Sequence, residues 1–288
     1  MQSRLYHYRS SAESLIRTLQ TAAREDKAAE AGASKMGCWA ACAFMLGVGS
    51  CVAAAPTADV NAALGALCLV VTAASLVSGL VCVTLRSRHL SHDLEDRKYQ
   101  SVVKLLKVTM PDLDPAHPIK MMIDFRGADV GGQLVKTEGG GFFSSESVRW
   151  FDHPWLTLRT RFADGNEISI GVSQSVKCKS KKKRKRTRIR MAGTETLRIA
   201  LKLRPAYGAP EKTLEALRAI AVPAGLTLSA ARSKDRWIKA TFRTGLAVVE
   251  GRLSEVKGGS VGLLLDGHKL LGALLWLDRG IGTARASS

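Results

Sequence analysis

The distribution of apolar residues divides the chain into a nearly uncharged block and a charged remainder. Between Lys35 and Arg86 there is a single charged residue, Asp59. Residues 36–55 are 20 uncharged residues and residues 61–85 are 25. At about 1.5 Å per residue, either stretch can cross a hydrocarbon core of about 30 Å as a helix. Because a proline and the one charge lie between them, the pattern predicts a membrane protein with a two-helix transmembrane hairpin.

The positive charges that flank this block predict its orientation. The 20 residues before the first span hold four Lys or Arg and the 20 after the second hold five, whereas residues 56–60 hold none. Lys and Arg are retained on the cytoplasmic side of a membrane. We therefore expect a multi-pass protein of the inner (plasma) membrane with both termini in the cytoplasm. The usage of alanine, glycine and arginine suggests a bacterial source.

Apolar residues at alternating spacings of three and four predict amphipathic helices on both sides of the hairpin. In residues 1–35 this seam includes Leu15 and Leu19, and residues 86–110 carry a looser apolar stripe. We expect one cytoplasmic helix at each place. Three prolines within residues 111–118 end the helical continuity, and they predict a domain boundary there.

In residues 118–280 the hydrophobic period changes to two, which predicts a soluble cytoplasmic α+β domain built on an antiparallel meander. Residues 155–162 alternate cleanly, a turn of the Asp-Gly type follows, and residues 196–204 alternate again. Residues 210–222 predict a short helix, because a proline stands at its first turn. The pattern of residues 247–280 leaves their structure open, and we expect core elements there.

One segment supplies most of the positive surplus of the chain. The sequence has 43 Lys+Arg and 25 Asp+Glu, for a formal net charge of +18. Residues 177–190 hold ten Lys or Arg and no acid, and we expect them to form the end of one strand, a basic loop at 179–186 and the start of the next strand. The polar face of the meander also carries arginines, and no acid lies in the strands expected at 155–162, 187–191 and 196–204.

Like charges opposite one another on a sheet are destabilising, so such a face indicates an anionic partner. The predicted anion-binding residues are Arg159, Arg161, Lys181, Lys182, Lys183, Arg184, Lys185, Arg186, Arg188, Arg190, Arg198, Lys202 and Arg204.

Three kinds of anionic partner fit this prediction. Anionic lipid headgroups come first, because the domain would hang from the cytoplasmic leaflet, where each basic residue contributes about 1 kcal/mol. Nucleic acid is an alternative, but the strands considered interleave arginine with Thr and Leu rather than with the aromatic residues on which bases stack. An acidic protein or a phosphorylated small molecule is the third. We expect a membrane-anchored binding or scaffolding module.

A two-span membrane effector is the alternative function. Its soluble domain would sense a ligand, and its spans would oligomerise. Small residues four apart, such as Gly37/Ala41 and Ser75/Gly79, would allow helices to approach closely in lipid. The order of helix, two spans, helix and soluble domain is similar to that of two-span membrane effectors in bacterial defence systems.

An enzyme is the third interpretation, and the sequence offers little for it. The pattern G-x-S-x-G around Ser260, followed by Asp266 and His268, lies in a glycine-rich segment rather than in the strand–turn–helix that a nucleophile elbow requires. His89 and His92 share a helical turn, but no further metal ligand accompanies them. We expect no catalytic residue, no metal and no cofactor.

Overall fold

A computed structural model describes residues 5–58, 62–90, 96–139, 145–183, 186–207, 209–252 and 265–286. The chain divides into two units, which we name the sheet unit and the hairpin unit. The sheet unit comprises Met1–Gln20 and Glu95–Ser288, and the hairpin unit comprises Thr21–Leu94. Helix α1, Ala12–Ala58, begins in the sheet unit and continues into the hairpin unit.

The hairpin unit consists of α1 and α2, Ala62–Leu90. Both contain a stretch long and apolar enough to cross a membrane, within Ala12–Ser50 and Ala66–Leu85. Large apolar side chains of both helices lie exposed on the outside of the hairpin, including Met45 at 72% and Leu80 at 67% exposure. Large exposed apolar patches mark surfaces that contact a protein or a membrane.

The inner surface of the hairpin joins the two helices through small and hydroxylated residues. Ser50 Oγ and Thr72 Oγ1 lie 2.8 Å apart and share a hydrogen bond between α1 and α2. A Cβ atom placed on Gly47 would lie 3.4 Å from the Cβ of Ser75, which is ordinary contact. These four residues therefore hold the two helices of one chain together.

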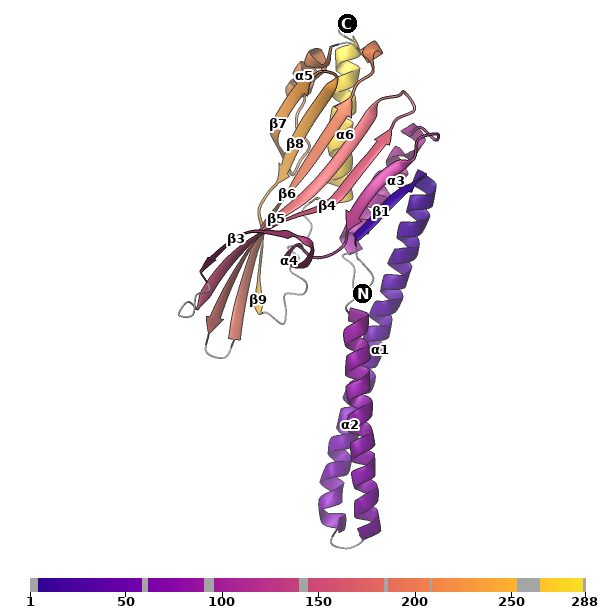
Figure 1. The fold of residues 1–288 in the computed structure, drawn as a ribbon, viewed down its shortest axis with the longest axis vertical. Helices are drawn as coiled ribbons and strands as arrows, with labels where there is room; N and C mark the ends of the chain where they lie inside the picture. The colour runs from indigo at the N-terminus through magenta and orange to yellow at the C-terminus, as the bar shows by residue number, and fades with distance from the viewer. Residues whose placement is uncertain are drawn as a thin grey trace. The chain divides into compact units, whose positions relative to one another are not determined.

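The sheet unit contains one antiparallel sheet. Among the described residues, nine strands take the order β1-β2-β4-β5-β6-β8-β7, with β3 beside β4 and β9 beside β6 (Figure 1). The strands are β1 Leu5–Ser10, β2 Ile119–Asp124, β3 Gln133–Gly139, β4 Glu146–Arg161, β5 Glu167–Lys183, β6 Arg186–Lys202, β7 Leu226–Lys234, β8 Trp237–Thr244 and β9 Ala247–Arg252.

Three helices of the sheet unit bury apolar residues against the sheet. Leu105 of α3 and Leu217 of α5 are 1% and 0% exposed. Trp276 of α6 packs edge-on against Phe242 of β8 with 5.3 Å between the ring centroids, and its Nε1 donates to the carbonyl of Ile220 at 3.2 Å. These three helices are α3 Asp96–Thr109, α5 Pro210–Ala219 and α6 Gly267–Ala286. The sheet unit also contains the short helix α4 Ala128–Gly131 and the 3₁₀ turns η1 Met110–Asp112 and η2 Pro205–Tyr207.

The predicted antiparallel α+β fold is confirmed in its main elements. Leu156 and Leu158 of β4 and Leu197 of β6 are at most 3% exposed, as the period-two pattern required. The predicted turn lies between β4 and β5, where Gly165 has a φ of +86° that a residue with a Cβ rarely adopts. Helix α5 begins with the predicted proline at its first turn.

The amino-terminal segment differs from the prediction of a continuous helix over residues 1–35. Residues Leu5–Ser10 form β1 and pair with β2 along its whole length. Tyr6 and Tyr8 stack on one face of β1, and Tyr6 also lies edge-on to Phe125 at 5.8 Å between the ring centroids. The predicted seam is helical only from Ala12 on, because residues 5–10 pair with a strand more than 100 residues away.

Most of the basic loop predicted within residues 177–190 is strand. β5 and β6 pair through this segment up to Lys183 and Arg186. Between the cations, Val176, Cys178, Ile189 and Met191 alternate inward and pack with Ala128 and Phe151 in a second, smaller core. The burial of these alternating residues stabilises strands where the density of charge alone indicated a loop.

Two further boundaries differ from the predicted ones. The part of 247–280 left open contains α6, and the helix continues to Ala286. The single helix predicted at 86–110 corresponds to two helices, the end of α2 and α3, which belong to different units. The sheet unit therefore includes β1 and α3, both of which lie before the predicted boundary at 118.

A fragment of residues 118–288 tests this larger unit. It lacks β1 and the four buried residues Tyr99, Val102, Leu105 and Leu106 of α3. At about 1.5–3 kcal/mol per buried side chain, their loss is comparable with the whole stability of a domain, about 5–15 kcal/mol. We expect an aggregated fragment without a cooperative thermal transition, measured by circular dichroism. A soluble fragment that melts cooperatively would contradict the assignment of β1 and α3 to this unit.

Candidate anion-binding face

The long pairing of β5 with β6 gives the sheet two chemically different faces. The pairing runs without a break from Glu167 and Lys202 to Lys183 and Arg186. Residues directly opposite share a face, so odd positions of β5 and even positions of β6 lie together throughout. The other positions carry the buried Ile168, Ile170, Val172, Leu197, Ile199 and Leu201. We name these the open face and the covered face.

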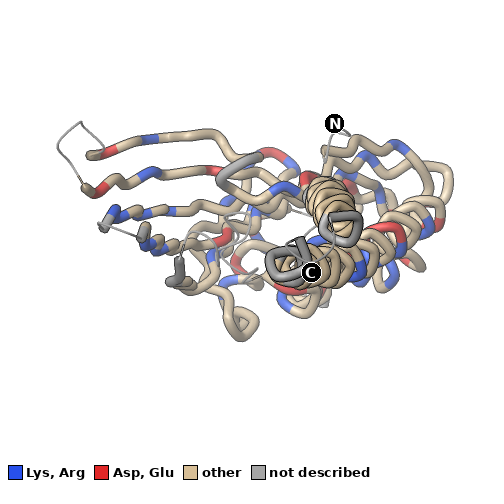
Figure 2. The backbone as a smooth tube through the Cα atoms, turned by 90° about the horizontal axis from the view of Figure 1, so that it is seen from below, with Lys and Arg blue, Asp and Glu red and all other residues tan. Residues whose placement is uncertain are grey.

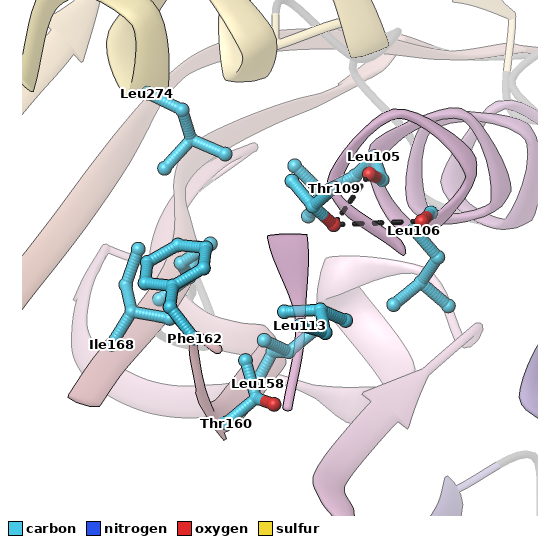
Figure 3. A pocket seen from close by; sticks show the side chains of 10 residues that line it. Leu105, Leu106, Thr109, Leu113, Leu158, Thr160, Phe162, Ile168 and Leu274 are labelled. Carbon is cyan, nitrogen blue, oxygen red and sulfur yellow. Dashed lines mark hydrogen bonds between the residues drawn. The ribbon is translucent and has the colours of Figure 1, made fainter. Parts of the chain in front are cut away.

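Helices close the covered face. Leu105 and Thr109 of α3 and Leu274 of α6 approach Leu158 and Ile168 of the sheet (Figure 3). The gap that these side chains leave is only about 10 Å³, hardly enough for one water molecule. The Thr109 hydroxyl, the polar group of this helix turn, donates to the carbonyl of Leu105 at 2.9 Å. This gap offers no room for a ligand, but a hollow of about 490 Å³ lies farther along the covered face, and its lining includes Ile168, Leu201 and Leu274.

The open face carries a row of cations that crosses the sheet. Strand register places the seven members of the row directly opposite one another. Five of the seven are exposed Lys or Arg, and basic residues lie along most strands of the sheet (Figure 2). From β1 to β7 the row is Arg9, Lys120, Arg159, Ser169, Ala200, Lys239 and Arg232.

The sheet register puts the predicted residues Arg159, Arg198 and Lys202 together on the open face. Two other predicted arginines serve the β4–β5 turn instead. Arg161 Nε donates to the carbonyl of Gly165 at 3.4 Å, and Arg204 Nη1 donates to that of Asp164 at 2.9 Å. These two guanidinium groups therefore already bind backbone carbonyls of the turn, whether or not a ligand is present.

The predicted anion-binding residues between 181 and 190 that the structure describes lie on the ends of β5 and β6 nearest their connection. Lys181 pairs with Arg188 on the open face, and both are exposed, as is the neighbouring Arg190. Lys182 is opposite Thr187 and points to the other face. Arg184 and Lys185 lie outside the described residues, as do the side chains of Lys183 and Arg186.

The open face is not free of acids, contrary to the prediction. Glu167 of β5 accepts a hydrogen bond from Lys202 at 3.5 Å. Glu146 of β4 forms an ion pair with Lys179, and Lys181 lies 3.7 Å from its second carboxylate oxygen. The hydrogen bond from Lys179 is the main cause that lowers the pKa of Glu146. The register also puts Asp152 of β4 and Glu138 of β3 on this face. All four acids come from strand positions that the sequence did not assign to it.

Two tryptophans share the open face, and sequence reasoning missed them. Trp237 of β8 has the ammonium of Lys202 5.8 Å from its ring centroid. Trp150 of β4 has Lys177 at 5.1 Å and Lys136 at 5.4 Å. The alternation of residues 146–152 could have placed Trp150, but β8 reaches the face only through its pairing with β6.

A shallow hollow surrounds the Trp150 ring on the open face. Its volume is about 770 Å³, and its lining combines Lys136 and Lys177 with the strongly exposed Val135 and Leu246. Asp152 also lines it, and Lys136 forms an ion pair with Glu138. Cations beside exposed apolar side chains form an amphipathic surface, which suits an anion that carries a hydrocarbon part.

A cluster of buried charges lies where β2, β4 and α3 meet. Asp124 accepts hydrogen bonds from Arg126 Nε at 2.9 Å and Nη2 at 2.7 Å, and His153 Nε2 lies 3.2 Å from its Oδ2. The Lys98 ammonium donates to the carbonyl of Arg126 at 2.8 Å and lies 5.7 Å from the centre of the Trp155 ring.

This buried cluster is structural rather than catalytic. Burial by itself would raise the pKa of Asp124, but His153 and Arg126 outweigh it and lower that pKa far below its usual range. Asp124 is 3% exposed, and Lys98 and His153 are 0% exposed. A substrate has no access to groups so enclosed, so the cluster fastens α3 to the sheet.

The sequence candidates for catalysis and metal binding do not form a site in the described part of the chain. Ser260, and the side chains of His89 and His92, lie outside the described residues. The Asp266 carboxylate accepts from the backbone of Lys269 at 2.9 Å and begins α6, and His268 Nε2 lies 2.6 Å from Lys104 Nζ. Among the described residues, no group of three His, Cys, Asp or Glu could hold a metal ion.

No family model matches the chain, and no curated protein or solved structure matches it significantly.

Replacing Asp124 with asparagine tests the buried cluster. Removing one partner of a buried ion pair leaves uncompensated charge, so we expect the free energy of unfolding to fall by about 3–5 kcal/mol. Because the folded pKa of Asp124 lies below its ordinary value of 3.8, the wild-type cluster stabilises the fold above about pH 4 and loses this effect as the pH falls further. Asp124→Asn should remove that part of the pH dependence.

Urea unfolding of the full chain at pH 3–7 measures both effects. Glu138→Gln is the control, since it removes the carboxylate of an exposed pair with Lys136 and should cost at most about 1 kcal/mol. Equal stabilities of Asp124→Asn and Glu138→Gln would contradict the structural role of the cluster.

Proposed function

We propose that the protein is a membrane-anchored binding module that holds an anionic partner on the open face of its sheet, with anionic lipid headgroups as the first partner. The observation that carries the proposal is the cationic row from Arg9 to Arg232. The open face costs electrostatic free energy in the free protein, and an anion bound there offsets this cost.

The hairpin unit supplies the anchor in this proposal. Two helices of sufficient length and apolar character occur in sequence, and their large side chains are exposed rather than buried. The flanking Lys and Arg favour cytoplasmic termini. The sheet unit then works beside the cytoplasmic leaflet of the inner membrane, which carries the anionic lipids.

Two features of the open face favour lipid over nucleic acid. Both tryptophans have a lysine ammonium near the ring, within 5.8 Å for Trp237 and 5.1 Å for Trp150. A base would have to displace these cations in order to stack. The exposed Val135 and Leu246 beside Lys136 and Lys177 suit a headgroup with an acyl chain below it. Nucleic acid and acidic protein are the competing outcomes of the test.

The quadruple variant Arg159→Gln, Arg198→Gln, Arg232→Gln and Lys239→Gln removes four exposed cations from the open face. With the full chain held in phosphatidylcholine nanodiscs, we measure co-sedimentation with vesicles that contain phosphatidylserine. At about 1 kcal/mol per cation, we expect binding to weaken up to about 1000-fold at low salt. Raising the salt to 1 M should release the wild type, because the screening length falls to about 3 Å.

A control variant changes the net charge equally on the helices of the covered face. Lys107→Gln, Lys212→Gln, Arg218→Gln and Arg279→Gln alter exposed side chains of α3, α5 and α6. We expect at most a threefold effect on vesicle binding. Equal losses in the two variants would show that net charge, and not the open face, governs binding. Wild-type binding to RNA but not to these vesicles would overturn the lipid proposal.

Reporter fusions test the proposed orientation. Alkaline phosphatase is active only outside the cytoplasm, so we expect an active fusion at Thr57 and an inactive one at Ser288. A fluorescent reporter that folds only in the cytoplasm should give the opposite pattern. Phosphatase activity at Ser288 together with inactivity at Thr57 would reverse the assigned orientation, and the open face would then lie away from the cytoplasmic leaflet.

A further inference from the structure

The cationic row is densest at the β1 edge of the sheet. Arg9 of β1 is directly opposite Lys120 of β2, and Lys120 is directly opposite Arg159 of β4. Neighbouring strands lie about 4.8 Å apart, so three cations are gathered over about 10 Å. The sequence gives no sign of this triplet, because its members come from three distant segments.

No acid compensates the triplet within the described residues. All three side chains are exposed, and none forms an ion pair or hydrogen bond with a described side chain. Along the strands, the neighbouring position on the same face holds His7, Met122 and Thr157, which carry no negative charge. The far end of the hairpin differs, since Glu146 there partners Lys179 and Lys181.

The chemistry of the triplet selects for a compact, multiply charged anion. A phosphomonoester carries about −1.5 to −2 charges at pH 7 and three acceptor oxygens on one atom. Two arginines can each give two parallel hydrogen bonds to such a group, and a lysine adds a point charge. A phosphodiester has a single charge and two free oxygens, so it would satisfy the triplet less completely.

We propose that Arg9, Lys120 and Arg159 form a phosphomonoester subsite, which rests on the proposed function of the open face and specifies the headgroup it prefers. Arg9 and Arg159 flank the central Lys120, so the guanidinium groups bind the phosphate from two sides. A terminal phosphate of a lipid such as phosphatidic acid and a soluble phosphomonoester share this chemistry. The remaining cations of the open face bind anions without this preference.

The test compares two lipids on the full chain in phosphatidylcholine nanodiscs. Vesicles with phosphatidic acid or phosphatidylserine are matched in zeta potential at pH 7.4, and co-sedimentation gives the ratio of the two affinities. We expect the wild type to bind phosphatidic acid at least tenfold more tightly. The double variant Arg9→Gln and Lys120→Gln should bring this ratio to about one.

Matched variants separate the subsite from general charge and from folding. Arg232→Gln with Lys239→Gln removes the same charge from the β7–β8 edge of the row and should keep the tenfold ratio. Arg9→Lys with Lys120→Arg keeps the charges and should retain at least a threefold preference. A wild-type ratio of one, or an unchanged ratio in the Arg9→Gln and Lys120→Gln variant, would overturn the subsite while phosphatidylserine binding still supports the open face. Binding to neither vesicle would overturn the proposed function itself.

Competition distinguishes the two sources of the phosphate. Glycerol 3-phosphate at 10 mM is compared with sodium chloride of equal ionic strength. If it releases wild-type chain from phosphatidic acid vesicles and not from phosphatidylserine vesicles, the soluble group is recognised by itself. If the tenfold preference persists in its presence, recognition of the phosphomonoester requires the lipid surface.

Discussion

The unbroken pairing of β5 with β6 determines the arrangement of the rest of the sheet unit. Seventeen residues of each strand lie in one register, so a single alternation assigns every side chain to the covered or the open face. A shift of β6 by one residue would turn Ile199 outward and bury Arg198 instead, at a large cost in both apolar burial and charge desolvation. That cost holds the register, and the register in turn places β4 and β8 and their side chains.

The same pairing explains how a highly basic segment can be ordered. Cations on alternate positions repel one another, but the intervening Val176, Cys178, Ile189 and Met191 are buried in the second core. Glu146 from β4 provides a carboxylate for Lys179 and Lys181. Apolar burial and local ion pairs thus offset the repulsion at this end, whereas the triplet at the β1 edge has no such compensation among the described residues. We therefore expect an anion to bind at the β1 edge, where no described acid offsets the repulsion between the cations.

Buried charge performs a different task on the other side of β2. Asp124 forms an ion pair with Arg126, and the buried Lys98 donates to the carbonyl of Arg126 and so fastens α3 to the sheet. Strand β1 pairs with the edge of β2 and leads directly into the long helix α1. The sheet unit is therefore completed by chain segments from both sides of the hairpin unit.

Local periodicity in the sequence determined the two apolar helices, the strands around Leu156 and Leu197, the β4–β5 turn and α5, because each depends on residues close together in the chain. It also identified Arg159, Arg198 and Lys202 as members of one polar face. Contacts between distant segments decided the rest. Residues 5–10 form a strand because they pair with β2. Most of the predicted basic loop is paired strand because its alternate residues are buried in the second core. The strand register alone places Arg9 and Lys120 beside Arg159. Hydrogen bonding between strands is indifferent to separation along the sequence, so no pattern within one segment could have shown these neighbours.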